Sequence, residues 1–507
     1  MEERNVQVLR MGGIYAGARN TVVAIRLPDD DYSGIVNVLA KIQPDLGFRN
    51  QDHALADLLE QPRIKQVLKS YCQADYWKRI WIVQEFAIGR RIDLLIGATL
   101  IDARKLEALF ECAERMTGKS IEGAEQAWKI LDIRRSREEG QRTDLFEILE
   151  MTQDSLCERR HDRVFGLLGL ISDTLDFLSE PNYQIDPTYL ASSMTRSYIE
   201  RRSLDIIILA QSIDVNRSMQ LPTWCPPLFW YDQYPPSRHL LDRALRHQEV
   251  RSYRWTHAWS TTGDSASSCT FEGAALVSPA RRIGRITSLG STWTDKDDTQ
   301  YPCHDRRWAQ MQRNPTRGSY VADLMIDAIL DRDYEYKRYQ KKSWPGKPVL
   351  ESYEKHYLVE VFRSKHGSNV AEDSQTPFQR WIRFNRKFSV CGKTLEDHAE
   401  RCRRTPLVFA VLSTKGFSYH SLKKMARKDM RMMCLDDDQY GIGWAAKGAR
   451  LDDEVFLIPG CSVPLILRRV EGTENYNLIG DAIVIGVMEG EVWNATRAAH
   501  LVQVRIV

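Results

Sequence analysis

The stretch YWKRIWIVQEF, residues 76–86, decides how the first part of this chain folds. Its apolar side chains spread nearly all round a helical wheel, so the spacing predicts a buried helix over Tyr76–Ile88. The next segment, Arg91–Gly97, is rich in Ile and Leu and closes on a glycine, which is typical of a buried strand. The helix side chains expected to be buried against that strand are Trp77, Trp81 and Val83.

Strands and helices also alternate ahead of this stretch. Residues 3–18 predict an amphipathic helix, Thr21–Arg26 is a short β-branched strand, and Asp52–Tyr71 is helical with an interruption at Pro62. The apolar residues that crowd towards one side of the first helix are Val6, Val8, Leu9, Met11, Ile14 and Tyr15. This alternation predicts an α/β layer structure with strand–helix–strand crossovers.

The rest of the chain changes texture twice. Residues 100–220 are mostly helical by pattern, and prolines at 222, 226 and 227 mark a boundary. We assign 1–228 to an α/β and helical domain, and 229–430 to an irregular region that is partly helical and partly disordered. Short β-rich runs separated by turn residues follow, so 431–507 is expected to form a small β-barrel or meander.

Composition limits the class of protein. The 507 residues are 43% hydrophobic and 27% charged, which excludes global disorder, and a net charge of +3 is too small to indicate nucleic-acid binding. The longest apolar runs, such as Ala482–Met488, are far shorter than the ~20 residues that span a bilayer. The start has no signal peptide, and no Cys-x-x-Cys pair occurs among 10 cysteines, so we expect a cytoplasmic protein.

No metal site is expected. Cys391, His398 and Cys402 lie within 12 positions, but no fourth ligand stands at a spacing that metal binding needs. A solvated helix with incidental cysteines is the favoured interpretation of these three residues.

Several motifs resemble the fungal heterokaryon-incompatibility (HET) domain family. The strongest is the stretch quoted first, because an arginine followed by a tryptophan and a Gln-Glu pair is similar to the third motif of that family. The matching positions are Trp77, Arg79, Trp81, Gln84 and Glu85, and Gly97 stands where the family's following strand ends.

Further matches follow in the family's order. Glu3–Val23 is similar to a helix with an Arg, a Met and an Ile-Tyr-x-x-Ala, and Arg159–Leu170 resembles an Arg-Asp motif built on Asp162. Leu221–Leu228 resembles a Leu-Pro-Ser-Trp segment, and Tyr440–Glu491 resembles a C-terminal β region that often accompanies these domains. One departure is a histidine at position 161, where the family usually has arginine.

The family's first two motifs, a Ser-Tyr-x-Trp-Gly strand and an Ile-Asp-x-x-Cys-Ile strand, would precede residue 1. We therefore expect an incomplete TIR-like layered α/β domain that lacks its first strands. Such a sheet would expose an unpaired edge and apolar surface, so the domain is expected to need a partner.

HET domains resemble TIR domains, and this resemblance implies a role for Glu85. TIR domains often carry a helical Trp-x-x-x-Glu whose glutamate is catalytic in members that hydrolyse NAD, and Trp81 and Glu85 have that spacing. The alternative is structural: Glu85 caps its helix or pairs with Arg79 or Arg90. Without the early strands and their loops, NAD cleavage is expected to be nearly absent.

Three functions remain open on the sequence. The resemblance implies a protein of fungal self/non-self recognition and cell-death signalling that assembles with itself or with another incompatibility protein. The alternatives are a TIR-like enzyme for which NAD is the substrate and Glu85 the catalytic residue, and an inactive relic of the family. No cofactor, nucleic acid or membrane span is predicted.

Overall fold

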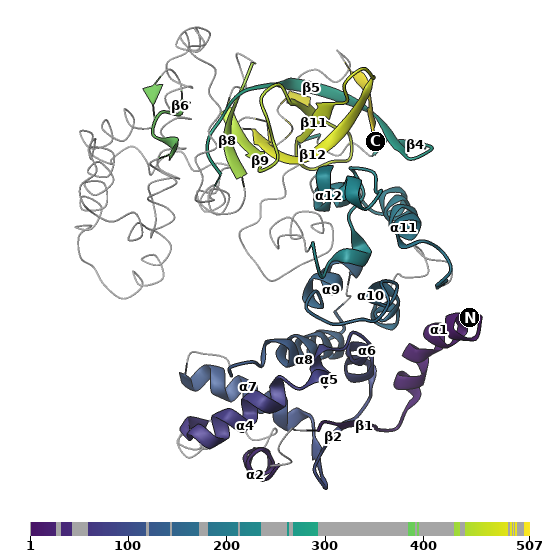
Figure 1. Ribbon diagram of the computed structural model, residues 1–507, viewed down its shortest axis with the longest axis vertical. Helices are drawn as coiled ribbons and strands as arrows, with labels where there is room; N and C mark the ends of the chain where they lie inside the picture. The colour runs from purple at the N-terminus through teal and green to yellow at the C-terminus, as the bar shows by residue number, and fades with distance from the viewer. Residues whose placement is uncertain are drawn as a thin grey trace, which may run out of the picture. The chain divides into compact units, whose positions relative to one another are not determined.

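The computed structural model describes most of the first 234 residues and much of the C-terminal β region (Figure 1). The described residues are 2–26, 32–42, 59–117, 121–141, 144–171, 181–210, 213–234, 261–262, 267–292, 384–390, 393–394, 430–436, 442–484, 487–488, 490, 492–493 and 501–507. The chain divides into two compact units: Met1–Arg201 with Cys225–Asp242, and Arg202–Trp224 with Arg243–Val507. Most of the region predicted to be irregular, and the candidate metal residues 391, 398 and 402, lie outside the described residues.

The first unit contains a three-stranded sheet in the order β1-β2-β3. Strand β1 (Thr21–Ala24) pairs parallel with β2 (Ile92–Ile96), which pairs antiparallel with β3 (Thr99–Asp102). The parallel pair requires a crossover, and helices fill it, so the predicted strand–helix–strand pattern and the mixed α/β class are confirmed. Gly97 has φ +61° and begins the tight turn between β2 and β3, a conformation that favours glycine.

Helices make up the rest of this unit. Pro62 stands at the first position of α4 (Pro62–Cys72), where a proline costs no hydrogen bond. The other helical segments are α1 (Glu2–Gly17), α2 (Ser33–Lys41), α5 (Asp75–Lys78), α6 (Trp81–Ile88), α7 (Arg104–Thr117), α8 (Glu125–Glu138), α9 (Leu145–Met151), α10 (Asp162–Phe165), η2 (Leu168–Leu170), α11 (Pro187–Arg201) and η5 (Leu228–Trp230).

The prediction of a single helix over Tyr76–Ile88 is wrong, because the helical path is interrupted at Arg79. This residue is extended (φ −81°, ψ 131°) and forms a β-bridge with Leu156, whose carbonyl accepts a hydrogen bond of 3.0 Å from Ile80. The amide of Leu156 in turn donates to the carbonyl of Lys78. The bridge satisfies backbone groups that a continuous helix would have used, so α5 and α6 form two short helices in place of one.

The break also corrects one of the predicted core positions. Trp77 is fully buried, packs on Phe86 and donates its indole hydrogen to the Tyr71 carbonyl at 3.0 Å, and Val83 is buried too. Trp81 is only half-buried. Because Trp77 and Trp81 belong to different helices, they do not share the one buried face that helical spacing assigned to them.

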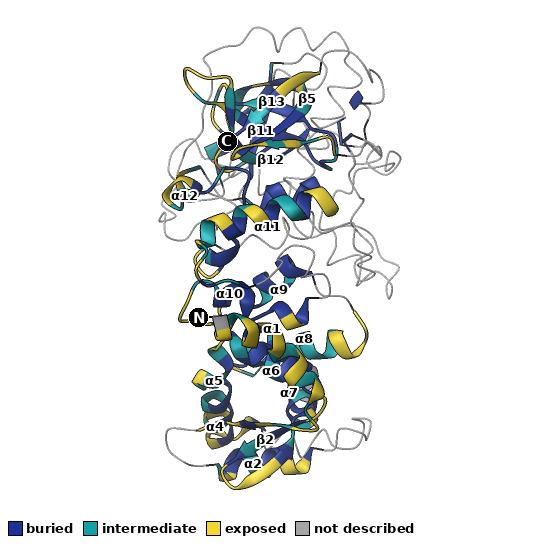
Figure 2. Ribbon diagram, turned by 90° about the vertical axis from the view of Figure 1, so that its right-hand side faces the viewer, coloured by how far each residue is buried: buried dark blue, intermediate teal, exposed yellow. Residues whose placement is uncertain are grey.

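Helix α1 is confirmed, but its apolar residues are not gathered in the core. Val8 is buried, whereas Val6, Leu9 and Ile14 are exposed. The helix lies beside α6 (Figure 2) and approaches η2 closely at Gly12. A Cβ placed on Gly12 would lie 3.0 Å from the Cα of Gly169, so this contact requires a residue without a side chain.

The second unit is built on an eight-stranded sheet that closes on itself. Strand β5 pairs with β10 along one stretch and with β8 along another, and the path β10-β11-β12-β9-β8 returns to β5. The strands are β4 (Thr270–Glu272), β5 (Ala275–Leu289), β8 (Met430–Leu435), β9 (Ile442–Ala446), β10 (Glu454–Leu457), β11 (Leu465–Arg469), β12 (Asn475–Val484) and β13 (Val502–Ile506). A short hairpin of β6 (Ser389–Val390) and β7 (Lys393–Thr394) is separate from this sheet.

The sheet closes because its long strands pair with different neighbours along their length. Strand β12 pairs with β11 over its first part and with β9 over its last part. Gly480, with φ +150°, lies where the register with β11 shifts, and a Cβ there would come within 2.6 Å of the Ala446 side chain. The β-rich runs predicted after residue 430 are strands, and residues 471–474 form the turn between β11 and β12. Strands β4 and β5, in contrast, lie in the stretch that was predicted to be irregular.

Two side chains from the preceding helical stretch are built into this unit, which also contains η4 (Leu204–Leu209) and α12 (Ile213–Ser218). The buried carboxylate of Asp205 accepts a hydrogen bond of 2.6 Å from the backbone of Ser462. Thr223 accepts at 2.9 Å from the backbone of Leu478, and its own amide donates to the Val507 carbonyl at 3.0 Å. Across the part of the chain that the structure describes, no helix is both long and apolar enough to cross a membrane.

Neighbouring glycines in α1 give a matched test of the close contact with η2. Gly13 has open space where a Cβ would go, so Gly13→Ala should stabilise the protein by roughly 0.5–1 kcal/mol through helix propensity. Gly12→Ala should lose that gain and destabilise by about 1 kcal/mol, because backbone must move to admit the methyl group. Denaturant unfolding of both variants checks this, and equal effects would show that the contact imposes no constraint.

Candidate functional site

Three side chains interact electrostatically with Glu85, and together with it they form what we call the Glu85 cluster: Tyr15, Tyr76, Arg79 and Glu85. Glu85 lies on α6 and is half-buried. Tyr15 comes from α1, and its hydroxyl donates a hydrogen bond to the Glu85 carboxylate. Tyr76 lies on α5, and Arg79 is the extended residue between α5 and α6.

Burial dominates the electrostatics of the carboxyl group. It raises the pKa of Glu85, because a charged carboxylate loses hydration in the partly buried position. The positive charge of Arg79 and the hydrogen bond from Tyr15 oppose the shift, since both favour the ionised form. Burial therefore favours the neutral form of the Glu85 carboxyl group, whereas Arg79 and Tyr15 favour its charged form.

The pKa values of the two tyrosines are both raised. Burial, followed by the adjacent Glu85 charge, raises the pKa of Tyr15 to about 12, so its hydroxyl remains a hydrogen-bond donor at neutral pH. Burial and the charge of Glu85 also raise the pKa of Tyr76. The Tyr76 hydroxyl is buried and has no hydrogen-bond partner among the described residues.

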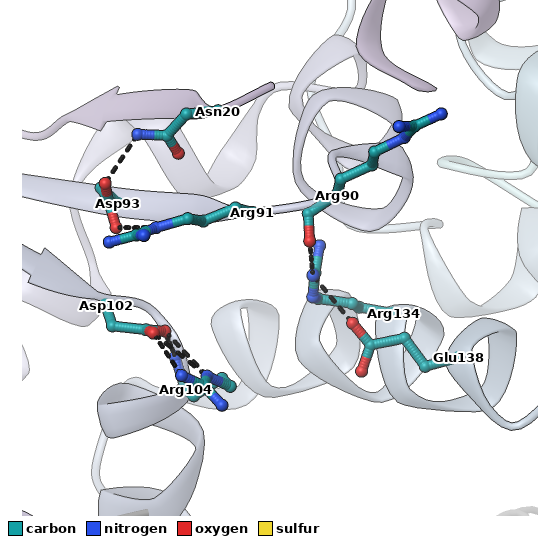
Figure 3. Close-up of polar contacts among 8 residues, drawn as sticks. All are labelled: Asn20, Arg90, Arg91, Asp93, Asp102, Arg104, Arg134 and Glu138. Carbon is teal, nitrogen blue, oxygen red and sulfur yellow. Dashed lines mark hydrogen bonds and ion pairs between the residues drawn. The ribbon is translucent and has the colours of Figure 1, made fainter. Parts of the chain in front are cut away.

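Arg134 fixes the end of the helix that carries Glu85. Its guanidinium donates to the carbonyls of Phe86 at 2.9 Å and Gly89 at 2.6 Å, and reaches that of Arg90 at 3.3 Å (Figure 3). An ion pair of 2.7 Å with Glu138 holds the guanidinium in place. Carbonyls at a helix C-terminus lack intrahelical partners, so this positive cap orients α6 and stabilises its dipole.

The strands beside α6 are tied by a second polar group. The buried carboxylate of Asp93 accepts from the Asn20 amide at 2.6 Å and from Arg91 at 3.2 Å, which joins the start of β1 to β2 (Figure 3). The side chain of Arg90 points away from these groups in the same view. The alternative pairing of Glu85 with Arg90 is thus absent from the described contacts, and Tyr15 is its hydrogen-bond partner.

Gln84 and Asp162 lie in the two stretches Tyr76–Phe86 and Arg159–Leu170, and a hydrogen bond joins these stretches. The buried Gln84 side chain donates to the Phe165 carbonyl at 3.4 Å, on the helix that Asp162 begins. Asp162 is buried and accepts a hydrogen bond of 2.6 Å from the Tyr183 hydroxyl. His161 donates through Nε2 to the Ile185 carbonyl at 2.8 Å, so it serves as a packing and hydrogen-bonding residue in place of the family's arginine.

The N-terminal helix also reaches this second group. The guanidinium of Arg4 lies over the ring of Tyr183, 5.4 Å from its centroid, and Arg159 lies 5.8 Å from it. Arg4 and Tyr15 are both on α1, so one helix contacts the Tyr183 ring near its start and Glu85 near its end. We interpret the Asp162 group as the anchor of α1.

Glu85 and Arg79, which share the sequence motif, interact electrostatically in the structure. The other predicted positions have structural roles. Trp77 is core, Gln84 and Asp162 are hydrogen-bonding links, and Gly97 is a turn residue. The sequence analysis missed Tyr15 and Tyr76 as neighbours of the carboxylate. Tyr76 is part of the quoted motif and Tyr15 lies in the upstream one, but no spacing rule links residues 70 positions apart.

Two protein-family models match the chain. The model described as heterokaryon incompatibility protein (HET) matches residues 1–85, ending at the candidate carboxylate, and the Het-6 beta-barrel domain matches residues 347–502. No curated protein and no solved structure matches this chain. Strand β5 of the barrel precedes the second matched range.

The raised pKa of Glu85 makes a prediction about stability and pH. The folded protein holds this proton more tightly than the unfolded chain, so the stability that Glu85 contributes is greatest at low pH and is lost as pH rises through the folded-state pKa. Glu85→Gln stays uncharged, so its melting temperature relative to the natural protein should increase from about pH 4 to about pH 7. Glu3→Gln removes an exposed carboxylate and controls for net charge, and a pH-independent difference for Glu85→Gln would contradict the burial argument.

Proposed function

Because this chain belongs to the heterokaryon incompatibility family, we propose that it acts in fungal self/non-self recognition and cell-death signalling, in the cytoplasm, by assembling with other proteins. The observation that supports assembly is a set of exposed apolar side chains on two consecutive elements, α1 and β1. We call it the α1–β1 surface, and its residues are Val6, Leu9, Ile14 and Val22, which are 46%, 44%, 57% and 52% exposed.

The edge of the sheet adds directional contacts to this surface. Among the described strands β1 pairs only with β2, so the backbone groups along its other edge are open to a further strand. Unpaired edges recruit strands from other chains. The apolar side chains and the open edge together make the first unit suited to association.

A comparison of magnitudes shows why both features are needed. Burying four half-exposed apolar side chains contributes on the order of 1 kcal/mol each. Association costs an estimated ~4–15 kcal/mol in lost translational and rotational freedom. The apolar residues alone do not offset this cost, so backbone pairing along β1 must carry part of the association.

A second candidate function is NAD cleavage in the manner of TIR domains, and the Glu85 cluster favours it. Hydrolysis would break the bond between nicotinamide and ribose C1′. The bonding electron pair would leave on nicotinamide, and water would add to C1′ and release one proton to solvent. The carboxylate of Glu85 would stabilise the positive charge that develops on the ribose. Tyr15 and Arg79, which favour the ionised form of Glu85, support that role.

Assembly is tested on the α1–β1 surface. Charges at Ile14 and Val22 (Ile14→Glu with Val22→Lys) should reduce self-association measured by light scattering and should reduce killing when the protein is expressed in a fungal host. Tyr189→Lys, at a residue of α11 that is 67% exposed, is the control and should leave both unchanged. An unaltered oligomer in the double variant would refute this surface as the site of association.

Nicotinamide release from NAD tests the enzymatic candidate. Release by the natural protein should be slow, because the early strands and their loops are not part of this sequence. Glu85→Gln keeps the shape of the side chain but removes its charge, so release should fall to the level without protein. Arg90→Gln removes an exposed charge near the end of α6 and should retain the rate. Equal release by the natural protein and Glu85→Gln would exclude Glu85 as the catalytic residue.

A further inference from the structure

The three-stranded sheet of the first unit has an open edge on each side. Among the described strands, β1 and β3 each pair only with the central strand β2, so the outer backbone groups of both edge strands are open to a further strand. Sheets extend by pairing of such edges when nothing covers them. The α1–β1 surface contains one of the two edges, and β3 forms the other.

The register places the exposed apolar residues of the two edges on the same face of the sheet. Val23, Leu94 and Ile101 are paired across the three strands and are all buried, so they mark the covered face. Val22 on β1 and Leu100 on β3 are next in sequence to two of these residues and therefore belong to the opposite face, where they are 52% and 58% exposed. A second copy that continued the sheet in the same orientation would bring its Leu100 beside Val22 of the first copy.

The charges that flank the strands favour pairing of two different edges. Arg19 and Arg26 stand two residues before and two residues after β1, are exposed, and form no ion pair among the described residues. Two antiparallel β1 strands would bring Arg19 of one copy near Arg26 of the other, and facing like charges are unfavourable. At the end of β3, Asp102 is paired with Arg104 at 2.8 Å, so the two charges there balance (Figure 3). Strand β3 therefore suits β1 better than a second β1 does.

We propose that copies of this chain associate head to tail, with β1 of one copy adding antiparallel to β3 of the next. The strand directions allow this, because β1 runs parallel to β2 and β3 runs antiparallel to it. Val22 of one copy would lie opposite Leu100 of the next, and Arg19 would lie at the end of β3 that carries Asp102. The inference rests on the proposed assembly and specifies which two surfaces meet.

A junction between two different edges has another outcome than a junction between two identical ones. Each copy keeps one free edge after head-to-tail pairing, so the sheet grows into a ring or a filament, whereas pairing of identical edges stops at a dimer. Pairing of two β3 strands would also leave Val22 and the outer edge of β1 uncovered. Mixtures of variants with one blocked edge distinguish these arrangements.

Light scattering of two edge variants, alone and mixed, tests the proposal. Val22→Lys blocks β1 and leaves β3 intact, whereas Leu100→Lys blocks β3 and leaves β1 intact, so each variant alone should have the mass of one chain. An equimolar mixture should have about twice that mass, because one natural β1 edge and one natural β3 edge are still present. Tyr189→Lys, exposed on α11, is the control and should assemble as the natural protein does.

Cross-linking of cysteine variants locates the contact. With a short bismaleimide reagent, a mixture of Val22→Cys and Leu100→Cys chains should give a linked dimer above the background of the natural protein. Either variant alone should not, and a chain with both substitutions should give a ladder of multimers. Both positions are more than half exposed, so melting temperatures equal to that of the natural protein should show that the fold is intact.

The results separate the head-to-tail junction from the alternatives. Dimers of Leu100→Lys alone would overturn it in favour of paired β1 edges, and dimers of Val22→Lys alone would overturn it in favour of paired β3 edges. A mixture that stayed monomeric would overturn it as well.

The same variants distinguish this inference from the proposed function. Assembly that is lost in the Ile14→Glu, Val22→Lys double variant but kept in Leu100→Lys would leave the proposed function standing and refute the junction with β3. Dimers in the mixture, together with undiminished killing by both single edge variants, would support the junction and count against its role in signalling.

Discussion

The relative placement of Tyr76, Arg79 and Glu85 in the candidate site depends on one extended residue. Arg79 leaves the helical path because the backbone on either side of it pairs with Leu156, which belongs to a segment more than 70 residues downstream. This pairing ends α5 and lets α6 begin at Trp81, so Arg79 lies on the link between the two helices and Glu85 on the second of them. In an unbroken helix, Arg79 and Glu85 would lie on different faces. Trp77 and Trp81 would then lie on one face.

The N-terminal helix is the second element on which the site depends, and it is held in an unusual way. Little of its apolar surface is buried, so its position relies on specific contacts: a glycine–glycine approach, a ring contact of Arg4 and the hydrogen bond of Tyr15. Contacts of this kind define position well but contribute modestly to stability. The same helix thus covers one side of Glu85 and leaves its outer residues available for association.

Local sequence patterns predicted most helices and strands but did not predict where these elements are interrupted. The alternation around Thr21–Ala24 and Ile92–Ile96 was enough to predict a parallel pair with a helical crossover, and the β-rich runs after residue 430 are strands. The break at Arg79 could not be predicted, because its cause is pairing with a distant residue. Strand β5 was missed for a different reason: its run ALVSPARRIGRITSL contains Pro279, Gly284 and three arginines, which local rules assign to loops.

The candidate site shows the same division. Glu85 and Arg79 were found because they share a motif, whereas Tyr15 was not linked to them, since the hydrogen bond joins segments 70 residues apart. Family resemblance supplied the order of the motifs, and only the three-dimensional structure showed which side chains meet. Burial of Trp81 was over-predicted because a helical wheel presumes a continuous helix.

The way the chain passes between its two units has a consequence for inheritance. The first unit takes residues up to Arg201 and again from Cys225 to Asp242, while Arg202–Trp224 belongs to the barrel unit, where Asp205 and Thr223 bond to distant strands. A single crossover between two alleles would therefore keep the barrel unit matched only if it fell before Arg202, because a later one joins Arg202–Trp224 from one parent to barrel strands from the other. Recombinants would keep a matched barrel only when both parts came from one parent. Diversity in such a gene would accumulate more readily by substitution within each unit than by exchange of whole units.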